Sequence, residues 1–184
     1  MSSTLPEENV WDYPRPPALE PVPQRLQVIW VDPQGKETKI ADTTSGYRVL
    51  ETSHPPSYYF PPKDVRMDLF TQSNKSSFCE WKGRATYFDF HPPSNINNNS
   101  SSKANVIPSR VWSYPEPTKG TKFSPIANYL SFYATPSTSQ ETVGTWKCFV
   151  QDEQVKPQDG DFYGSWITSN LHGKMKGGPG TWGW

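Results

Sequence analysis

Proline is the residue that most restricts how this chain can fold. The 20 prolines lie along most of the 184-residue sequence, and several stand in pairs such as Pro16-Pro17, Pro55-Pro56 and Pro61-Pro62. A proline has no backbone N–H to donate, and its ring clashes with the preceding turn of a helix. Together with 12 glycines, this distribution excludes long helices and favours short strands joined by fixed turns.

Aromatic side chains must supply much of the hydrophobic core. Only 33% of the residues are hydrophobic, but 14% are aromatic and 8 residues are tryptophan. Each buried ring removes roughly 150–250 Å² of surface from water. A chain of 184 residues can therefore form one domain with a substantial core, and the sequence predicts an all-β domain with one or two short helices.

Charge and apolar patterning limit which binding partners and which cellular compartment are expected. The chain has 18 Lys plus Arg and 18 Asp plus Glu, so no broad attraction to nucleic acid or anionic membranes is expected. Neither an apolar segment after Met1 nor a run long enough to cross a membrane is present, so neither a signal peptide nor a membrane span is predicted. Cys79 and Cys148 are then expected to be free thiols in the cytoplasm. The oligomeric state stays open.

Composition divides the chain into three segments. Residues 1–24 are proline-rich and are expected to form an extended arm, which Trp11 and Tyr13 pack onto the domain. Residues 25–176 form the single domain. Within it, residues 94–105 form a polar loop of low complexity that is expected to be mobile. Residues 177–184 are a tail rich in glycine and tryptophan.

Alternation of apolar residues predicts the strands. A long strand is expected at Ser77–Phe90, and Tyr58–Phe60 lie in a short strand or edge segment between prolines. Ile126, Tyr129, Leu130 and Tyr133 follow helical spacing after Ser124-Pro125, which predicts one short helix. Further strands are expected at residues 25–32, 36–42, 47–52, 110–114, 146–151, 153–155 and 162–168.

No metal or cofactor is expected. The two cysteines are far apart, and His54, His91 and His172 are isolated, whereas structural zinc sites use closely spaced pairs. The sequence also lacks a phosphate-binding loop, a dinucleotide-binding glycine motif and a serine nucleophile motif. Gly177–Gly180 is glycine-rich, but no helix follows it to bind a phosphate.

Charged residues among aromatic ones allow two interpretations. Arg48 with Glu51, and Glu80 with Lys82 and Arg84, are either surface pairs of small energy or the polar part of a small-molecule pocket. Cys79 is either a small apolar filler in a strand or a nucleophile activated by a nearby cation. The aromatic side chains that would wall such a pocket, or alternatively fill the core, are Tyr58, Tyr59, Trp81, Tyr87, Trp112 and Tyr114.

Several segments together resemble family 427 of the domains of unknown function. The resemblance spans about residues 10–184 in the right order, with the loop at 94–105 as a local insertion. The closing Gly177–Trp184 run resembles longer eukaryotic members, such as fungal ones. The segments that carry the resemblance are Arg48–Pro56, Tyr58–Val65, Cys79–Tyr87, Trp112–Pro117, Tyr129–Tyr133 and Asp161–Trp166.

The resemblance implies a β-tent fold, which methionine sulfoxide reductase B and related zinc-carrying domains share. Those relatives hold zinc with Cys-x-x-Cys pairs, which this chain lacks, so neither the metal nor a reductase mechanism is carried over. Some labels of the family say nucleotidyltransferase. The chain has neither a phosphate-binding loop nor paired acidic metal ligands to support that activity.

Two hypotheses of function follow. The first is a metal-free, aromatic-lined pocket for a small molecule, with acid–base chemistry of the isomerase, lyase or hydrolase type. Glu51 or Glu80 would be the base, Lys82, Arg48 or a tyrosine hydroxyl would stabilise negative charge, and Cys79 is the alternative nucleophile. The second is a protein-interaction module that uses the proline-rich arm and the tryptophan-rich tail.

Overall fold

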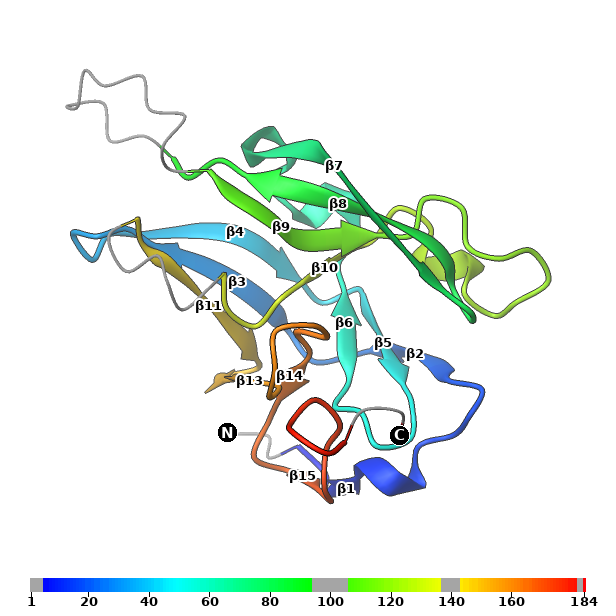
Figure 1. Cartoon of the computed structure of the whole chain (residues 1–184). Helices are drawn as coiled ribbons and strands as arrows, with labels where there is room; N and C mark the ends of the chain where they lie inside the picture. The colour runs from blue at the N-terminus through cyan, green and yellow to red at the C-terminus, as the bar shows by residue number, and fades with distance from the viewer. Residues whose placement is uncertain (1–4, 94–105, 137–142, 182–183) are drawn as a thin grey trace.

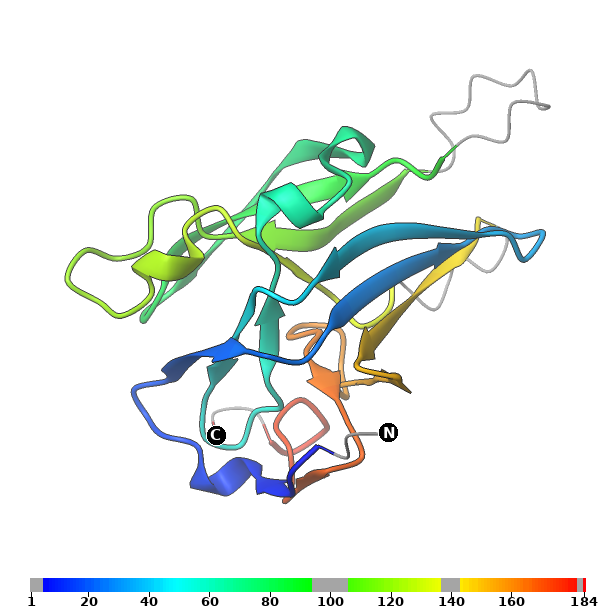
Figure 2. The same ribbon diagram turned by 180° about the vertical axis from the view of Figure 1, so that it is seen from behind.

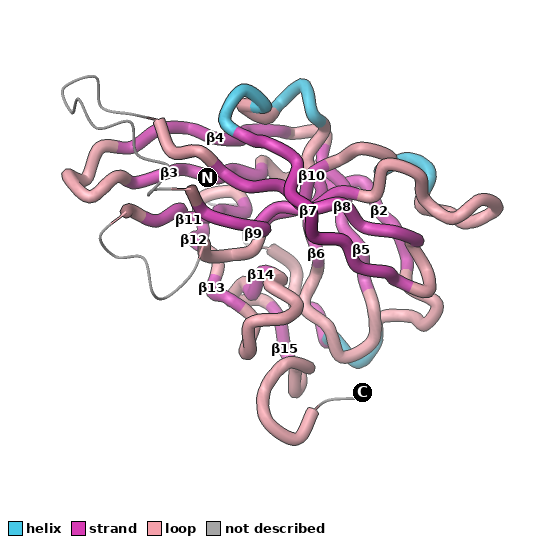
Figure 3. The backbone as a smooth tube through the Cα atoms, turned by 45° about the horizontal axis from the view of Figure 1, so that its top comes forward, coloured by secondary structure: helices cyan, strands magenta, loops and turns pink. Residues whose placement is uncertain are grey.

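Short strands make up most of the regular structure. A computed structural model describes residues 5–93, 106–136, 143–181 and 184, so the predicted loop at 94–105 lies outside the described residues. Figure 3 shows strands and loops, with helical segments confined to single 3-10 turns in the described part of the chain. The prediction of an all-β single domain is confirmed. The 3-10 turns are η1 (Val10–Asp12), η2 (Pro62–Asp64), η3 (Met67–Leu69) and η5 (Ser124–Ile126).

Two four-stranded antiparallel sheets enclose the main core within the described residues. Figures 1 and 2 show one sheet above the other. The lower sheet has the order β12-β11-β3-β4, and its strands are β3 (Leu26–Val31), β4 (Glu37–Thr43), β11 (Thr145–Val150) and β12 (Glu153–Gln154). The upper sheet has the order β10-β9-β8-β7, and its strands are β7 (Phe70–Cys79), β8 (Gly83–Phe90), β9 (Ile107–Ser113) and β10 (Leu130–Phe132).

Aromatic rings fill the space between these two sheets. On β3, alternate residues Leu26, Val28 and Trp30 are buried, as expected for a strand with one face on a core. Trp30 contacts the edge of Phe90 across the sheets, at 5.0 Å between ring centroids. Trp146 and Trp166 donate their indole N–H groups to the carbonyls of Tyr133 and Phe132. Large rings with satisfied polar groups thus compensate for the low share of aliphatic residues.

A three-stranded sheet lies below the two large ones (Figures 1 and 2). Its central strand is β5 (Gly46–Leu50), which pairs with β2 (Ala18–Val22) and with β6 (Ser57–Tyr59). Residues 18–22 of the expected arm are therefore a strand of the sheet. Pro21 is tolerated there because β2 is an edge strand.

The beginning and the end of the described chain lie against each other. β1 (Glu8–Asn9) pairs in parallel with β15 (Leu171–His172). The indole N–H of Trp11 donates to the carbonyl of Lys174 at 2.9 Å, and the Trp11 ring contacts that of Trp184. A further small antiparallel pair is formed by β13 (Lys156–Pro157) and β14 (Trp166–Ile167).

Three predicted elements differ in the structure. Residues 77–90 form a hairpin, because the chain turns at residues 80–82 between β7 and β8. The predicted helix after Ser124-Pro125 ends after one 3-10 turn. Asn128 adopts a positive φ of 64°, which a helix does not allow, and Leu130 exchanges backbone hydrogen bonds with Phe60. The strand predicted at residues 162–168 is reduced to β14, and Gly164 before it has a positive φ of 68°, which does not fit a strand.

Candidate functional site

A cavity of about 480 Å³ lies between the three-stranded sheet and the tip of the β7–β8 hairpin. Ser57 and Tyr59 of β6 line one side, and the hairpin tip lines another. All predicted site residues except Arg48 and Tyr58 line this cavity. Those that do are Glu51, Tyr59, Cys79, Glu80, Trp81, Lys82, Tyr87, Trp112 and Tyr114.

The tight turn of the hairpin brings Cys79 and Lys82 to the same cavity. Cys79 pairs with Gly83, which closes a three-residue turn, and Gly83 has a φ of 96° that favours glycine. A Cβ at this position would lie 3.1 Å from the hydroxyl of Thr118, whose N–H donates to the carbonyl of Lys82. The tip is thus fixed against the loop that follows β9.

Lys82 is a buried cation that forms no ion pair with any described residue. Its exposed fraction is 8%, and no carboxylate of a described residue lies within ion-pairing distance of its ammonium group. The ammonium lies 5.4 Å from the ring centroid of Tyr114. Burial alone would lower the pKa of Lys82, but attraction by Tyr59, Cys79 and Glu51 outweighs it, so the pKa is raised. Lys82 therefore carries its positive charge at neutral pH.

Two buried tyrosines face this charge. Burial raises the pKa of Tyr59, although Lys82 and a hydrogen bond with Trp112 oppose the shift. Burial also raises the pKa of Tyr114, and neighbouring Tyr59 and Cys79 raise it further. Both hydroxyls therefore stay protonated at neutral pH and can donate to a negatively charged oxygen.

Glu51 and His54 lie on another side of the cavity. Arg15, from the arm, donates to the carboxylate of Glu51 at 2.7 Å. Burial lowers the pKa of His54 to about 4; Glu51 opposes this shift, while Lys176 and Lys82 add to it. His54 is therefore neutral at physiological pH, and its ring meets the edge of Tyr163 at 4.5 Å between centroids.

The structure places Arg48 and Tyr58 away from the cavity. They are cross-strand partners on β5 and β6, and neighbouring residues of a strand face opposite sides. Val49 and Tyr59 therefore line the cavity, whereas the ring of Tyr58 packs against Trp166 in the main core. The expected role of both residues in binding a ligand there does not fit this geometry.

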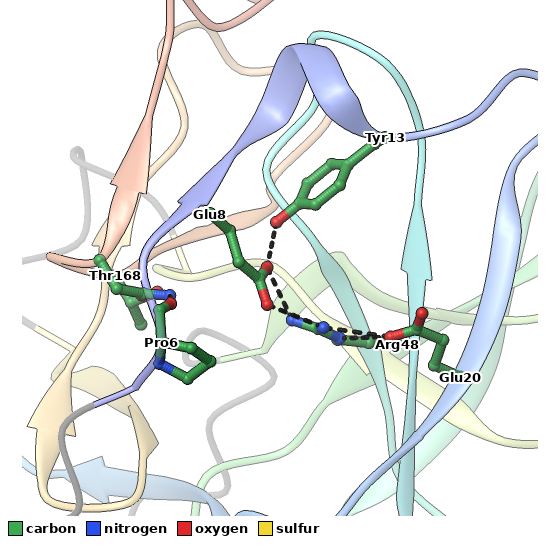
Figure 4. A network of polar contacts seen from close by, with 7 residues as sticks. Pro6, Glu8, Tyr13, Glu20, Arg48 and Thr168 are labelled. Atoms are coloured by element: carbon green, nitrogen blue, oxygen red, sulfur yellow. Dashed lines mark hydrogen bonds and ion pairs between the residues drawn. The ribbon is translucent and has the colours of Figure 1, made fainter.

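Arg48 instead holds the arm to the sheet (Figure 4). Its guanidinium donates two hydrogen bonds of 2.9 Å to Glu8 and bonds of 3.1 and 3.2 Å to Glu20. Tyr13 donates its hydroxyl to the same Glu8 carboxylate. Burial alone would lower the pKa of Arg48, but Glu8 outweighs it and raises the pKa. We refer to Glu8, Tyr13, Glu20 and Arg48 as the Arg48 cluster.

Sequence reasoning missed several residues of the cavity. Arg15 and His54 were not singled out, because one lies in the proline-rich arm and the other looked isolated. Phe162, Tyr163 and Ser165 also line the cavity, and they belong to the segment Asp161–Trp166 that carries part of the family resemblance. The family resemblance was therefore the sequence feature that pointed to this loop.

Within residues 5–93, 106–136, 143–181 and 184, no three His, Cys, Asp or Glu side chains come together as a metal site. In the same part of the chain, no helix has the length and hydropathy needed to cross a membrane. Both cysteines are free thiols.

A family model matches residues 18–144, and its description reads "Domain of unknown function (DUF427)". The chain belongs to this family. No curated protein matches the chain. The DUF427 match includes the residues from Glu51 to Tyr114 that line the cavity, whereas Arg15, Phe162, Tyr163, Ser165 and Lys176 lie outside it. Lys82 and its tyrosines thus belong to the DUF427 region, and part of the rim is added by flanking segments.

Proposed function

We propose that this DUF427 protein binds a small organic anion in the cavity, with the anionic group against Lys82. The observation that carries the proposal is the 8% exposed lysine, which lines the cavity without a described carboxylate as partner. Burying an unpaired charge is costly, so proteins normally pair it. A carboxylate or similar group of a ligand would supply the missing partner.

The size and lining of the cavity support an organic ligand. Its volume of about 480 Å³ lies within the roughly 300–1,000 Å³ range of small-molecule sites. Trp81, Tyr87 and Trp112 supply the aromatic surface that an apolar or planar ligand body requires. The ligand class is therefore an organic acid with an apolar body.

The charges around the cavity also favour an anion. The cations Arg15, Lys82 and Lys176 line it, against the carboxylates Glu51 and Glu80. Arg15 is paired with Glu51, and Glu80 is exposed to water. The remaining positive charge faces the interior, where low polarity strengthens its attraction for an anion.

Acid–base catalysis is the chemistry that this arrangement supports. Lys82 with the hydroxyls of Tyr59 and Tyr114 would stabilise negative charge that develops on a substrate oxygen. Glu51, which accepts a hydrogen bond from Arg15, would remove a proton, with neutral His54 beside it as a second base. Glu80 is less suited because it is exposed at the hairpin tip.

Tryptophan fluorescence tests anion binding, since Trp81 and Trp112 line the cavity. Benzoate should quench the fluorescence of the full chain, and the uncharged isostere benzamide should bind about tenfold more weakly. Lys82→Met should remove this preference, whereas Lys119→Met, at an exposed lysine outside the cavity, should keep it. Equal binding of benzoate and benzamide by the wild-type chain would end the proposal.

The alternative, a protein-interaction module, has weaker support. The arm and the tail contact each other within the chain, through Trp11 with Lys174 and Trp184. Surfaces engaged in this way are less available to a partner chain. We also propose that the site is metal-free and that the protein is cytoplasmic. The two free thiols support a cytoplasmic location.

A further inference from the structure

We propose that Cys79 is a reactive thiol that adds reversibly to carbonyl compounds carrying a carboxylate, such as 2-oxo acids, bound in the cavity. The inference rests on the proposed anion site and extends it from binding to covalent chemistry. It identifies a subset of organic acids, those with an electrophilic carbon beside the carboxylate, as the ligands that fit.

The two cysteines of the chain differ in access. Cys148 is 1% exposed within β11, and its thiol points at the carbonyl of Tyr133, 3.8 Å away. Burial raises the pKa of this thiol well above its usual range. Cys79 is half-buried and lines the cavity. A bound ligand therefore meets Cys79 and cannot reach Cys148.

Lys82 supplies the second, independent indication of a ligand at Cys79. Cys79 comes directly before the three-residue turn that ends at Lys82, and both residues line the cavity. Because Lys82 is buried and has no described carboxylate as partner, it attracts an anionic ligand to the position next to the sulfur.

The reaction needs no further reagent. The sulfur of Cys79 forms a bond to the carbonyl carbon, the π bond of the carbonyl breaks, and its electron pair moves to the oxygen. The thiol proton ends on that oxygen, and the product is a hemithioketal, or a hemithioacetal if the carbonyl is an aldehyde. Tyr114 lines the same cavity, and its protonated hydroxyl would donate to the developing oxyanion. Nothing is oxidised or reduced, and no group leaves.

Alkylation rates at the two cysteines test the inference. The full chain is treated with iodoacetate or iodoacetamide, and peptide mass spectrometry follows Cys79, with Cys148 as the internal reference. The ratio of the iodoacetate rate to the iodoacetamide rate at Cys79 should exceed that of the urea-unfolded chain by about tenfold. Lys82→Met should bring the ratio down to the unfolded value, and Lys119→Met should leave it unchanged.

A second arm uses the wild-type chain alone and does not depend on a variant that folds. Glyoxylate, an aldehyde with a carboxylate, should protect Cys79 from iodoacetamide more strongly than glycolate, which lacks the carbonyl. Labelling of Cys79 as slow as that of Cys148, or equal protection by both acids, overturns the inference. If benzoate still quenches the tryptophan fluorescence in that case, anion binding stands and only the covalent step fails. If benzoate also binds no better than benzamide, both proposals fail.

Discussion

Arg48 and Lys82 are both largely buried cations, but the groups that surround their charges differ. The Arg48 cluster surrounds its cation with Glu8 and Glu20, and both carboxylates come from elements that the cation ties to β5. Lys82 faces a cavity near the rings of Tyr114 and Phe123, and no carboxylate of a described residue lies within ion-pairing distance of it. From this contrast we infer that Arg48 stabilises the fold, and we propose that Lys82 keeps its charge for a ligand.

Replacing Arg48 should give the largest effect on stability. Arg48→Met leaves the carboxylates of Glu8 and Glu20 without their shared partner and frees the arm from β5. Because the Arg48 side chain is 22% exposed, we expect a loss of about 3–4 kcal/mol in the free energy of unfolding. Urea denaturation measures it. A loss below about 0.5 kcal/mol, the value typical of a surface pair, would break the comparison.

The pH dependence of stability should show the contribution of buried, neutral His54. Its pKa of about 4 in the folded protein lies below the value of about 6.5 expected when unfolded. Between these values the unfolded chain binds a proton that the folded chain does not, so stability falls as the pH falls from about 6.5 to about 4, by about 3 kcal/mol in all. No further loss from His54 is expected below about pH 4.

A substitution isolates this contribution. His54→Gln should lack the loss between pH 6.5 and pH 4, which urea denaturation at several pH values measures against the wild type. Because the charge of Lys82 helps to lower the pKa of His54, Lys82→Met should make the same loss smaller. Parallel pH profiles for wild type and His54→Gln would show that His54 is not buried as a neutral ring.

Replacing Gly83 at the hairpin turn should reduce stability and benzoate binding more than replacing Gly120 on the loop after β9. Gly83→Ala places a Cβ at a φ of 96° and 3.1 Å from the Thr118 hydroxyl, so we expect a loss of about 1–2 kcal/mol and weaker benzoate binding. Gly120→Ala is the matched control, since Gly120 also has a positive φ but its Cβ would meet nothing within 4 Å. Benzoate affinity that falls equally in both variants would contradict the role of the hairpin tip.

Replacing Lys82 should change stability very little, in contrast to replacing Arg48. Lys82→Met removes a buried charge that lacks an acidic partner among the described residues and keeps an apolar stem of similar length. We expect the free energy of unfolding to change by less than about 1 kcal/mol. Urea denaturation beside Arg48→Met provides the comparison. A loss as large as that of Arg48→Met would show that Lys82 is structural.

Much of the fold was predictable because burial leaves a pattern along a strand. The alternation of Leu26, Val28 and Trp30 predicted β3, and the prolines of residues 1–24 predicted an extended segment, which includes the edge strand β2. The turn at residues 80–82 was not predictable in the same way. Cys79, Trp81 and Gly83 alternate as if in one strand, and only the packing of Gly83 on Thr118 shows where the chain reverses.

The sequence could predict many of the residues that line the cavity, but not which faces of the strands form its walls. Residue types alone identified Tyr59, Cys79 and Lys82 as candidates, and the structure brings them together. They could not show which face of β5 and β6 meets the cavity, because Arg48 and Val49 are both plausible inward residues until the register is known. Nor could they place Arg15 beside Glu51, since that contact joins residues far apart in the sequence.

The most direct test is the crystal structure of the full chain soaked with 4-bromobenzoate. Our account predicts a carboxylate oxygen at about 2.7–3.0 Å from the Lys82 nitrogen, with the bromine located by its anomalous signal beside Trp81 or Trp112. An empty cavity at a concentration that quenches the fluorescence, or a carboxylate bound to Arg15 instead of Lys82, would contradict it.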